Sequence, residues 1–103
     1  MVLKSEARAY CIEYFHAKPA YKNQLVNALL KLVTPSRAEE GCLQYDLLQD
    51  NKDPNLIILI VQFTNQEMMS NHEKQSFVTD FSKNELQQYC EKLTWSDANA
   101  ITQ

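Results

Sequence analysis

Gly41 is the only glycine among the 103 residues of the chain, and this scarcity limits the folds that are open to it. Loops that bind dinucleotides or nucleoside triphosphates need several glycines, because their backbone N–H groups must approach phosphate oxygens closely. Both of those fold families are therefore excluded. The length fits one domain, residues 1–103, and 45% apolar residues suffice for a hydrophobic core.

The charge balance and hydropathy restrict the partners. Ten Lys and Arg stand against 13 Asp and Glu, so an acidic chain of net charge −3 has no basis for tracking nucleic-acid phosphates. The longest apolar run, residues 56–61, is far too short to span a membrane, and no basic-then-apolar leader opens the chain. We expect a soluble, cytoplasmic protein with neither nucleic-acid nor membrane partners.

The cysteines and histidines are too scattered to form a ligand cluster. Cys11, Cys42 and Cys90 include no Cys-x-x-Cys pair, and His16 and His72 lie far apart. We expect free thiols in a reducing compartment. We also expect no metal, and no flavin, because one glycine cannot build a phosphate cradle.

The first strand is predicted over residues 7–17, which are rich in aromatic and β-branched side chains. Its alternation places Tyr10, Ile12, Tyr14 and His16 on one face and Ala9, Cys11, Glu13 and Phe15 on the other. Glu13 is unusual within so apolar a strand. Two interpretations stay open: it reaches solvent at an edge, or it is an acid in a pocket.

A helix is predicted from Tyr21, because apolar residues then recur every three or four positions. Pro35 should either bend this helix or end it, with a short turn restarting over residues 36–40. Gly41 follows where a left-handed cap would close the segment. The acidic residues 39–40 are expected to lie on a solvated face.

Two strands, over residues 42–49 and 56–63, are joined by a polar turn and should form a hairpin. The second is almost continuously apolar, which indicates burial on both faces. Helix resumes as a short segment through His72 and a longer one from about Ser76, whose apolar side is expected to extend to Leu93. A final strand is predicted over residues 94–102.

The resulting order, β-α-β-β-α-β, is that of a ferredoxin-like α+β fold with one four-stranded antiparallel sheet. Helices on one face leave the other face uncovered, although it includes the apolar strand 56–63. We therefore expect a homodimer that forms through the sheet.

Several motifs resemble the antibiotic biosynthesis monooxygenase superfamily. They are residues 40–47 (EGCLQYDL), the polar turn with Asp53-Pro54, the apolar third strand, and His72 followed by Ser76-Phe77. The similarity covers about residues 7–93. It implies a dimeric α+β barrel and a quinol-monooxygenase-like activity on small aromatic, quinol or polyketide-like molecules, without metal or flavin.

Such an oxygenase needs a dry pocket, a base and walls that hold a flat substrate. His72 is the candidate catalytic base, expected on the pocket rim; the alternative is a structural histidine between two helical segments. The candidate substrate-binding residues are Tyr14, Tyr45, Phe63, Met68, Phe77 and Phe81, although tyrosines and methionines at such positions are also common in cores.

Two other functions stay open on the same fold. The family usually carries an acidic residue and then Trp at the end of the third strand, where this chain has Val61 and Phe63. That departure favours a non-catalytic ligand-binding dimer. An isomerase of small phosphorylated metabolites would need cationic groups near the pocket, and Arg8 and Arg37 are the only arginines. The substrate is not defined by the sequence.

Overall fold

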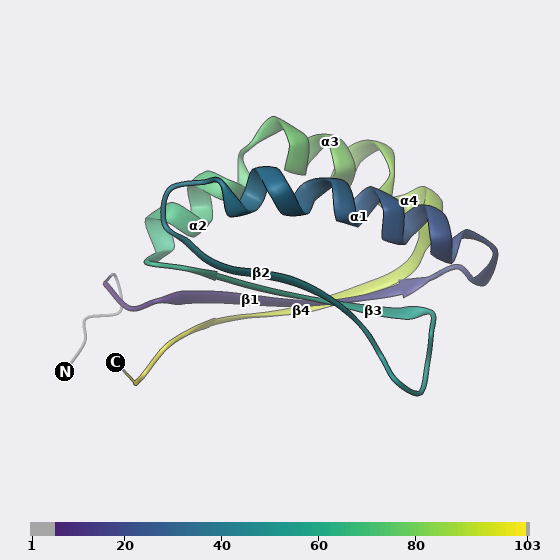
Figure 1. The fold of residues 1–103 in the computed structure, drawn as a ribbon, viewed down its shortest axis with the longest axis horizontal. Coiled ribbons are helices and arrows are strands. Elements are labelled where there is room, and N and C mark those ends of the chain that lie inside the picture. The colour runs from purple at the N-terminus through teal and green to yellow at the C-terminus, as the bar shows by residue number, and fades with distance from the viewer. Residues whose placement is uncertain (1–5, 103) are drawn as a thin grey trace.

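A computed structural model describes residues 6–102. Four strands form one antiparallel sheet in the order β2-β3-β1-β4 (Figure 1). The strands are β1 (Ala9–Ala17), β2 (Cys42–Gln49), β3 (Leu56–Phe63) and β4 (Cys90–Asn99). The helices are α1 (Lys22–Arg37), α2 (Gln66–Glu73), α3 (Ser76–Asn84) and α4 (Leu86–Tyr89), with a 3-10 turn η1 (Pro19–Tyr21) before α1.

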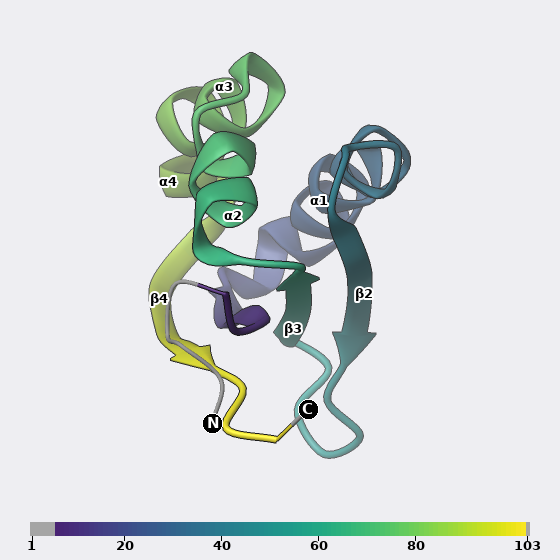
Figure 2. The ribbon, with the colours of Figure 1, turned by 90° about the vertical axis from the view of Figure 1, so that its left-hand side faces the viewer.

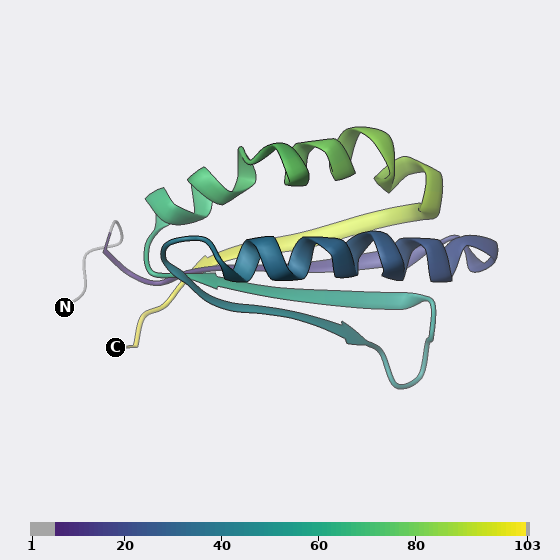
Figure 3. The ribbon, with the colours of Figure 1, turned by 45° about the horizontal axis from the view of Figure 1, so that its top comes forward.

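All four helices lie on the same face of the sheet (Figure 2). Helix α1 crosses above the β2 and β3 half, and the chain of α2, α3 and α4 runs above the β4 half (Figure 3). This arrangement confirms the ferredoxin-like α+β fold. No helix in residues 6–102 is long and apolar enough to cross a membrane.

Helix α1 continues through Pro35 and ends at Arg37, without the restart over residues 36–40 that was one of the two expectations. Proline has no N–H, so the helix lacks the hydrogen bond that residue 35 would donate to the carbonyl of Lys31, and only two helical residues follow it. Gly41 then takes a positive φ of 84°, as predicted for the end of this segment.

Strand β3 differs from the expectation of burial on both faces. Ile57, Leu59, Val61 and Phe63 are buried beneath the helices, whereas the alternate residues, such as Ile58 and Ile60, are only half-buried. The reason is the layering: in residues 6–102 the helices all lie on one face of the sheet, so the side chains on its other face keep part of their exposure.

The predicted boundary of the last strand was wrong. Cys90 and Leu93 were expected on a helix, but β4 begins at Cys90 and ends at Asn99. The apolar residues Leu86, Tyr89, Cys90 and Leu93 are spaced as on one face of a helix, although α4 ends at Tyr89. Pairing with β1, in which Leu93 lies opposite Phe15, satisfies the backbone of the central strand and overrides that local pattern.

Gly41 provides a test of the fold. A Cβ there would lie 2.8 Å from both Met68 Cγ and Thr64 Oγ1, in addition to the strain of a positive φ. Gly41→Ala should therefore lower the free energy of unfolding by about 1–3 kcal/mol in urea denaturation. Ala38→Gly, on the exposed helix end nearby, is the control and should change it by under about 1 kcal/mol. Equal effects of the two substitutions would contradict this account.

Candidate functional site

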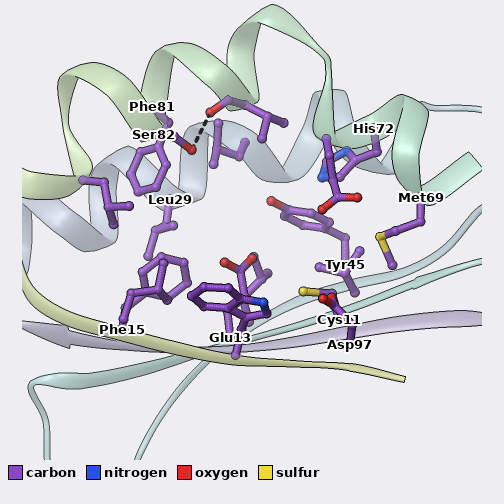
Figure 4. Close-up of a pocket in the computed structure, with 18 residues that line it drawn as sticks. Cys11, Glu13, Phe15, Leu29, Tyr45, Met69, His72, Phe81, Ser82 and Asp97 are labelled. Atoms are coloured by element: carbon purple, nitrogen blue, oxygen red, sulfur yellow. Dashed lines mark hydrogen bonds between the residues drawn. The ribbon is translucent and has the colours of Figure 1, made fainter. Parts of the chain in front are cut away.

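A cavity of about 320 Å³ lies between the helical layer and the sheet (Figure 4). All four strands and all four helices contribute apolar or aromatic side chains to its walls, and its polar groups come from both layers. The lining residues are Cys11, Glu13, Phe15, Leu29, Leu32, Tyr45, Leu59, Val61, Met69, His72, Glu73, Val78, Phe81, Ser82, Leu86, Leu93, Trp95 and Asp97.

Strand register builds the floor of the cavity. In the pairing of β1 with β4, Cys11 lies opposite Asp97, and Glu13 lies opposite Trp95. Since alternate residues of a strand point to one face, these four side chains all face the helices. The two strands therefore bring two acids, a thiol and an indole together.

Helix periodicity builds the roof. Asn65 caps α2, its side chain accepting a hydrogen bond of 2.9 Å from the Met68 backbone N–H. Met69, His72 and Glu73 follow at the spacing of one helix face and all line the cavity. Figure 4 shows His72 and Met69 above the floor formed by Glu13 and Cys11.

The buried His72 pairs with the partly buried Glu39. The ring Nδ1 lies 2.5 Å from Glu39 Oε2, and His72 is only 6% exposed. A carboxylate can only accept, so Nδ1 carries the hydrogen and Nε2 is the nitrogen left to take a proton. His72 was expected on the pocket rim; it lines the cavity and is buried there. The expectation for Glu39 was wrong, because its carboxylate pairs with His72 instead of lying on a solvated face, whereas Glu40 is exposed.

Aromatic rings hold the His72 imidazole from three sides. The ring centroids of Tyr45, Phe63 and Phe77 lie 5.6, 5.1 and 6.2 Å from that of His72. Together with the Glu39 carboxylate, this packing gives the imidazole one orientation. An oriented carboxylate–histidine pair beside a cavity is the arrangement of a general base.

Burial changes the pKa of three groups that line the cavity, Glu13, Tyr45 and Cys11. Burial raises the pKa of Glu13 to about 7, and the negative charges of Glu73 and Asp97 add to that rise. Burial also raises the pKa of Tyr45 to about 12, so its phenol remains a hydrogen-bond donor at neutral pH. The pKa of the Cys11 thiol is raised by burial and by neighbouring carboxylates, which keeps it protonated and weakly nucleophilic.

The structure brings some of the predicted site residues together and not others. His72, Tyr45 and Phe81 line the cavity. Phe63 and Phe77 stand behind His72 as packing partners, and Met68 lies against Gly41, with Met69 reaching the cavity instead. Tyr14 points from β1 to the opposite face of the sheet and is 36% exposed.

Most of the floor could not be located from the sequence. Cys11 and Glu13 were predicted to share one face of their strand. An acid in a pocket was one of the two interpretations left open for Glu13. Trp95 and Asp97 were not considered. Their alternation along the last strand was a usable signal, but the strand's pairing partner was needed to show where they point.

Among the described residues that line this cavity there is no Lys or Arg. Within residues 6–102, no three His, Cys, Asp or Glu side chains come together in a way that could hold a metal ion. His72, Glu13 and Tyr45 bring groups to the cavity that can transfer protons or form hydrogen bonds.

Comparisons with known proteins agree on one family. The family model described as "Antibiotic biosynthesis monooxygenase" matches residues 9–84. A Bacillus subtilis protein named "Putative monooxygenase YcnE" is 28% identical over 68 residues, which is 66% of this chain and 72% of that one.

Solved structures share the fold. PA3566 from Pseudomonas aeruginosa superimposes with a TM-score of 0.86 at 28% identity, covering 95% of this chain and 98% of that one. SO0527 from Shewanella oneidensis gives a TM-score of 0.89 at 18% identity, covering 92% of each chain. The resemblance inferred from residues 40–47 and His72 is confirmed.

The Glu39–His72 pair is testable by stability. Glu39→Ala leaves the buried Nδ1–H without an acceptor, so the free energy of unfolding should fall by about 1–3 kcal/mol. Glu39→Gln retains an acceptor oxygen and should cost less. Glu40→Ala, on the exposed neighbour, is the control and should stay within about 0.5 kcal/mol of wild type in urea denaturation. If Glu39→Ala matched Glu40→Ala, the pair would add nothing to stability, and packing alone would orient His72.

Proposed function

Because the chain belongs to the antibiotic biosynthesis monooxygenase family, we propose that it is a monooxygenase that acts on a small quinol or polyketide-like phenol without a metal or flavin. The observation that carries this proposal is the buried Glu39–His72 pair beside a cavity of about 320 Å³ with largely apolar walls. We further propose that residues 1–103 work as a single cytoplasmic domain, which the three free cysteines support.

Such a reaction draws its electrons from the substrate. A hydroquinone that loses a phenolic proton becomes electron-rich enough to donate an electron to dioxygen. The protein then has to remove the proton, exclude water and hold the ring flat. Overall, the quinol and dioxygen give a hydroxyquinone and one water.

His72 takes the phenolic proton in this scheme. Glu39 holds Nδ1–H, so Nε2 receives the proton, and the carboxylate stabilises the imidazolium that forms. Tyr45 faces the same cavity with a phenol that stays protonated at neutral pH, and it donates a hydrogen bond to the substrate oxygen. The edge-to-face pair of Phe15 and Phe81, with centroids 6.3 Å apart, provides an apolar wall for the ring.

A non-catalytic ligand-binding role is the second candidate, and one observation favours it. Val61 and Phe63 stand where the family usually has an acidic residue and Trp, and both are buried, so no polar group enters the cavity from the end of β3. The isomerase alternative has less support. A phosphorylated ligand needs cations, and the cavity lining offers carboxylates instead.

Oxygen uptake with a panel of hydroquinones tests the proposed activity. His72→Ala should lower turnover by about 10²–10⁴-fold, because it removes the base. His16→Ala is the matched control: it changes the other histidine, which lies on β1 two residues after Tyr14 and outside the cavity lining, and should leave turnover unchanged.

His72→Ala is also expected to be less stable than wild type, because it empties a buried site between three aromatic rings. His72→Gln, which fills more of that site, separates the two effects: it should recover stability but not turnover. Full turnover in a folded His72 variant would remove this residue from the mechanism.

We also propose that the open face of the sheet binds a second copy of the chain. Ile12, Ile58 and Ile60 lie side by side there, since Ile12 pairs with Ile60 and Tyr14 with Ile58. An apolar sheet face of this kind is a typical interface in symmetric dimers. At one end, Arg8 donates hydrogen bonds to Tyr10 (3.1 Å) and Gln62 (3.2 Å), which supplies a polar rim.

Light scattering at micromolar concentration should give twice the 12.0 kDa mass of the chain. Ile60→Lys places a charge in the centre of the proposed interface and should yield monomers or aggregates. Leu30→Lys, at an exposed apolar position on α1, is the control and should remain dimeric. A monomeric wild-type protein would refute the proposed dimer.

A further inference from the structure

In the part of the chain that the structure describes, the carboxyl group of Glu13 makes no contact that would explain it as a stabilising residue of the strand. It lies on the central strand β1 between Cys11 and Phe15, and its backbone neighbours across the sheet are Leu59 and Trp95. Within residues 6–102, Glu13 has no ion pair and no side-chain hydrogen bond. Its carboxyl instead faces the cavity from the floor (Figure 4).

An acid in this position destabilises the fold when it is ionised. Partial burial removes water from the carboxylate, and the part of the lining that the structure describes offers it no Lys or Arg. The other titratable groups of the lining face the same cavity as Glu13. They are Cys11 on β1, Tyr45 on β2, His72 and Glu73 on α2, and Asp97 on β4. The carboxylates among these oppose a further negative charge, so Glu13 is easily kept as a neutral acid, which donates a hydrogen bond.

We infer that Glu13 is a second proton-transferring group of the cavity, which donates a hydrogen bond from its protonated carboxyl to an oxygen atom of the bound aromatic molecule. The floor position of Glu13 and the roof position of His72 place the two groups on opposite walls of one cavity. A ring held between them has one group to accept a proton and another to supply one.

The catalytic part of this inference rests on the proposed function. His72 takes the phenolic proton, and the ring anion combines with dioxygen to form a C–O bond and a peroxide anion. Glu13 protonates that peroxide. The O–O bond then breaks, the ring C–H electron pair forms the new carbonyl, and hydroxide leaves with the released ring proton as water. His72 then releases its proton to solvent and Glu13 takes one up, so that both groups return to their starting states.

The binding part is measured without turnover. The probe is 2,3-dimethyl-1,4-naphthoquinone, which can only accept hydrogen bonds and whose blocked ring carbons do not add thiols. Trp95 is the only tryptophan and lines the cavity, so quenching of its fluorescence reports binding. The dissociation constant is measured from pH 5.5 to 8.5.

Affinity of the wild type should weaken by about tenfold as pH rises through 7, because an ionised carboxylate can no longer donate. Burial raises the pKa of Glu13 to about 7, and this value sets the window. Glu13→Gln retains an amide donor that does not titrate, so its affinity should be constant across the range. Glu67→Gln, on α2 but outside the lining, is the control and should keep the wild-type profile.

A second variant identifies which group titrates. Glu73→Gln removes a charge that raises the pKa of Glu13, so it should keep the pH dependence but move its midpoint to lower pH. A profile in the wild type that is flat, a Glu13→Gln variant that still titrates, or a quinone that binds at no pH would each overturn the inference.

Oxygen uptake then separates the two proposals. If wild type turns over a hydroquinone, Glu13→Gln should lower the rate by about 10²-fold or more. The activity of the wild type should fall above pH 7, whereas the residual activity of Glu13→Gln should not. If wild type consumes no oxygen with any substrate, the proposed function fails, while the binding profile still decides the role of Glu13. A fully active Glu13→Gln enzyme would overturn the inference and leave the proposed function intact.

Discussion

The antiparallel pairing of β1 with β3 on one side and β4 on the other is the interaction on which the site depends. Because strand residues alternate with a period of two, a slip of one residue would turn every side chain of β1 to the other face. The observed register points Cys11 and Glu13 toward the helices and places Trp95 and Asp97 beside them. The same register sends Tyr10, Ile12 and Tyr14 to the open face. One set of backbone hydrogen bonds thus separates the cavity floor from the proposed dimer interface.

The cavity also shows how the chain accommodates polar groups that burial would otherwise destabilise. His72 lies among aromatic rings, and Glu39 from the end of the α1 segment supplies the acceptor that its Nδ1–H requires. Glu13 has no such partner in the described residues and is instead kept neutral more readily by its surroundings. Two titratable groups in one cavity therefore have different environments, one hydrogen-bonded and one desolvated. The proposed division of labour, in which His72 accepts a proton and Glu13 donates one, rests on this difference.

Family membership establishes the fold of this chain but does not define the reaction. The match over residues 9–84 and the shared fold establish the family. A fold of this kind hosts several chemistries, so the activity has to be argued from the side chains in the cavity. The Phe63 ring, 5.1 Å from His72, occupies a position where the family usually has tryptophan, and it still serves as a packing surface for the imidazole.

The sequence by itself determined the order of elements, the hairpin of residues 42–63, the left-handed position of Gly41 and the family. These depend on local periodicity, turn chemistry and short motifs, which are readable along the chain. Only the tertiary structure decided that Glu39 reaches His72, that Tyr14 faces away from the cavity, and that Cys90 begins a strand. Each of those depends on which distant segment packs against the residue. Glu39 and His72 are 33 residues apart in the chain, and β1 and β4 come from opposite ends of it. The local sequence pattern predicts which residues share a face of a helix or strand, whereas tertiary packing determines which residues that face contacts.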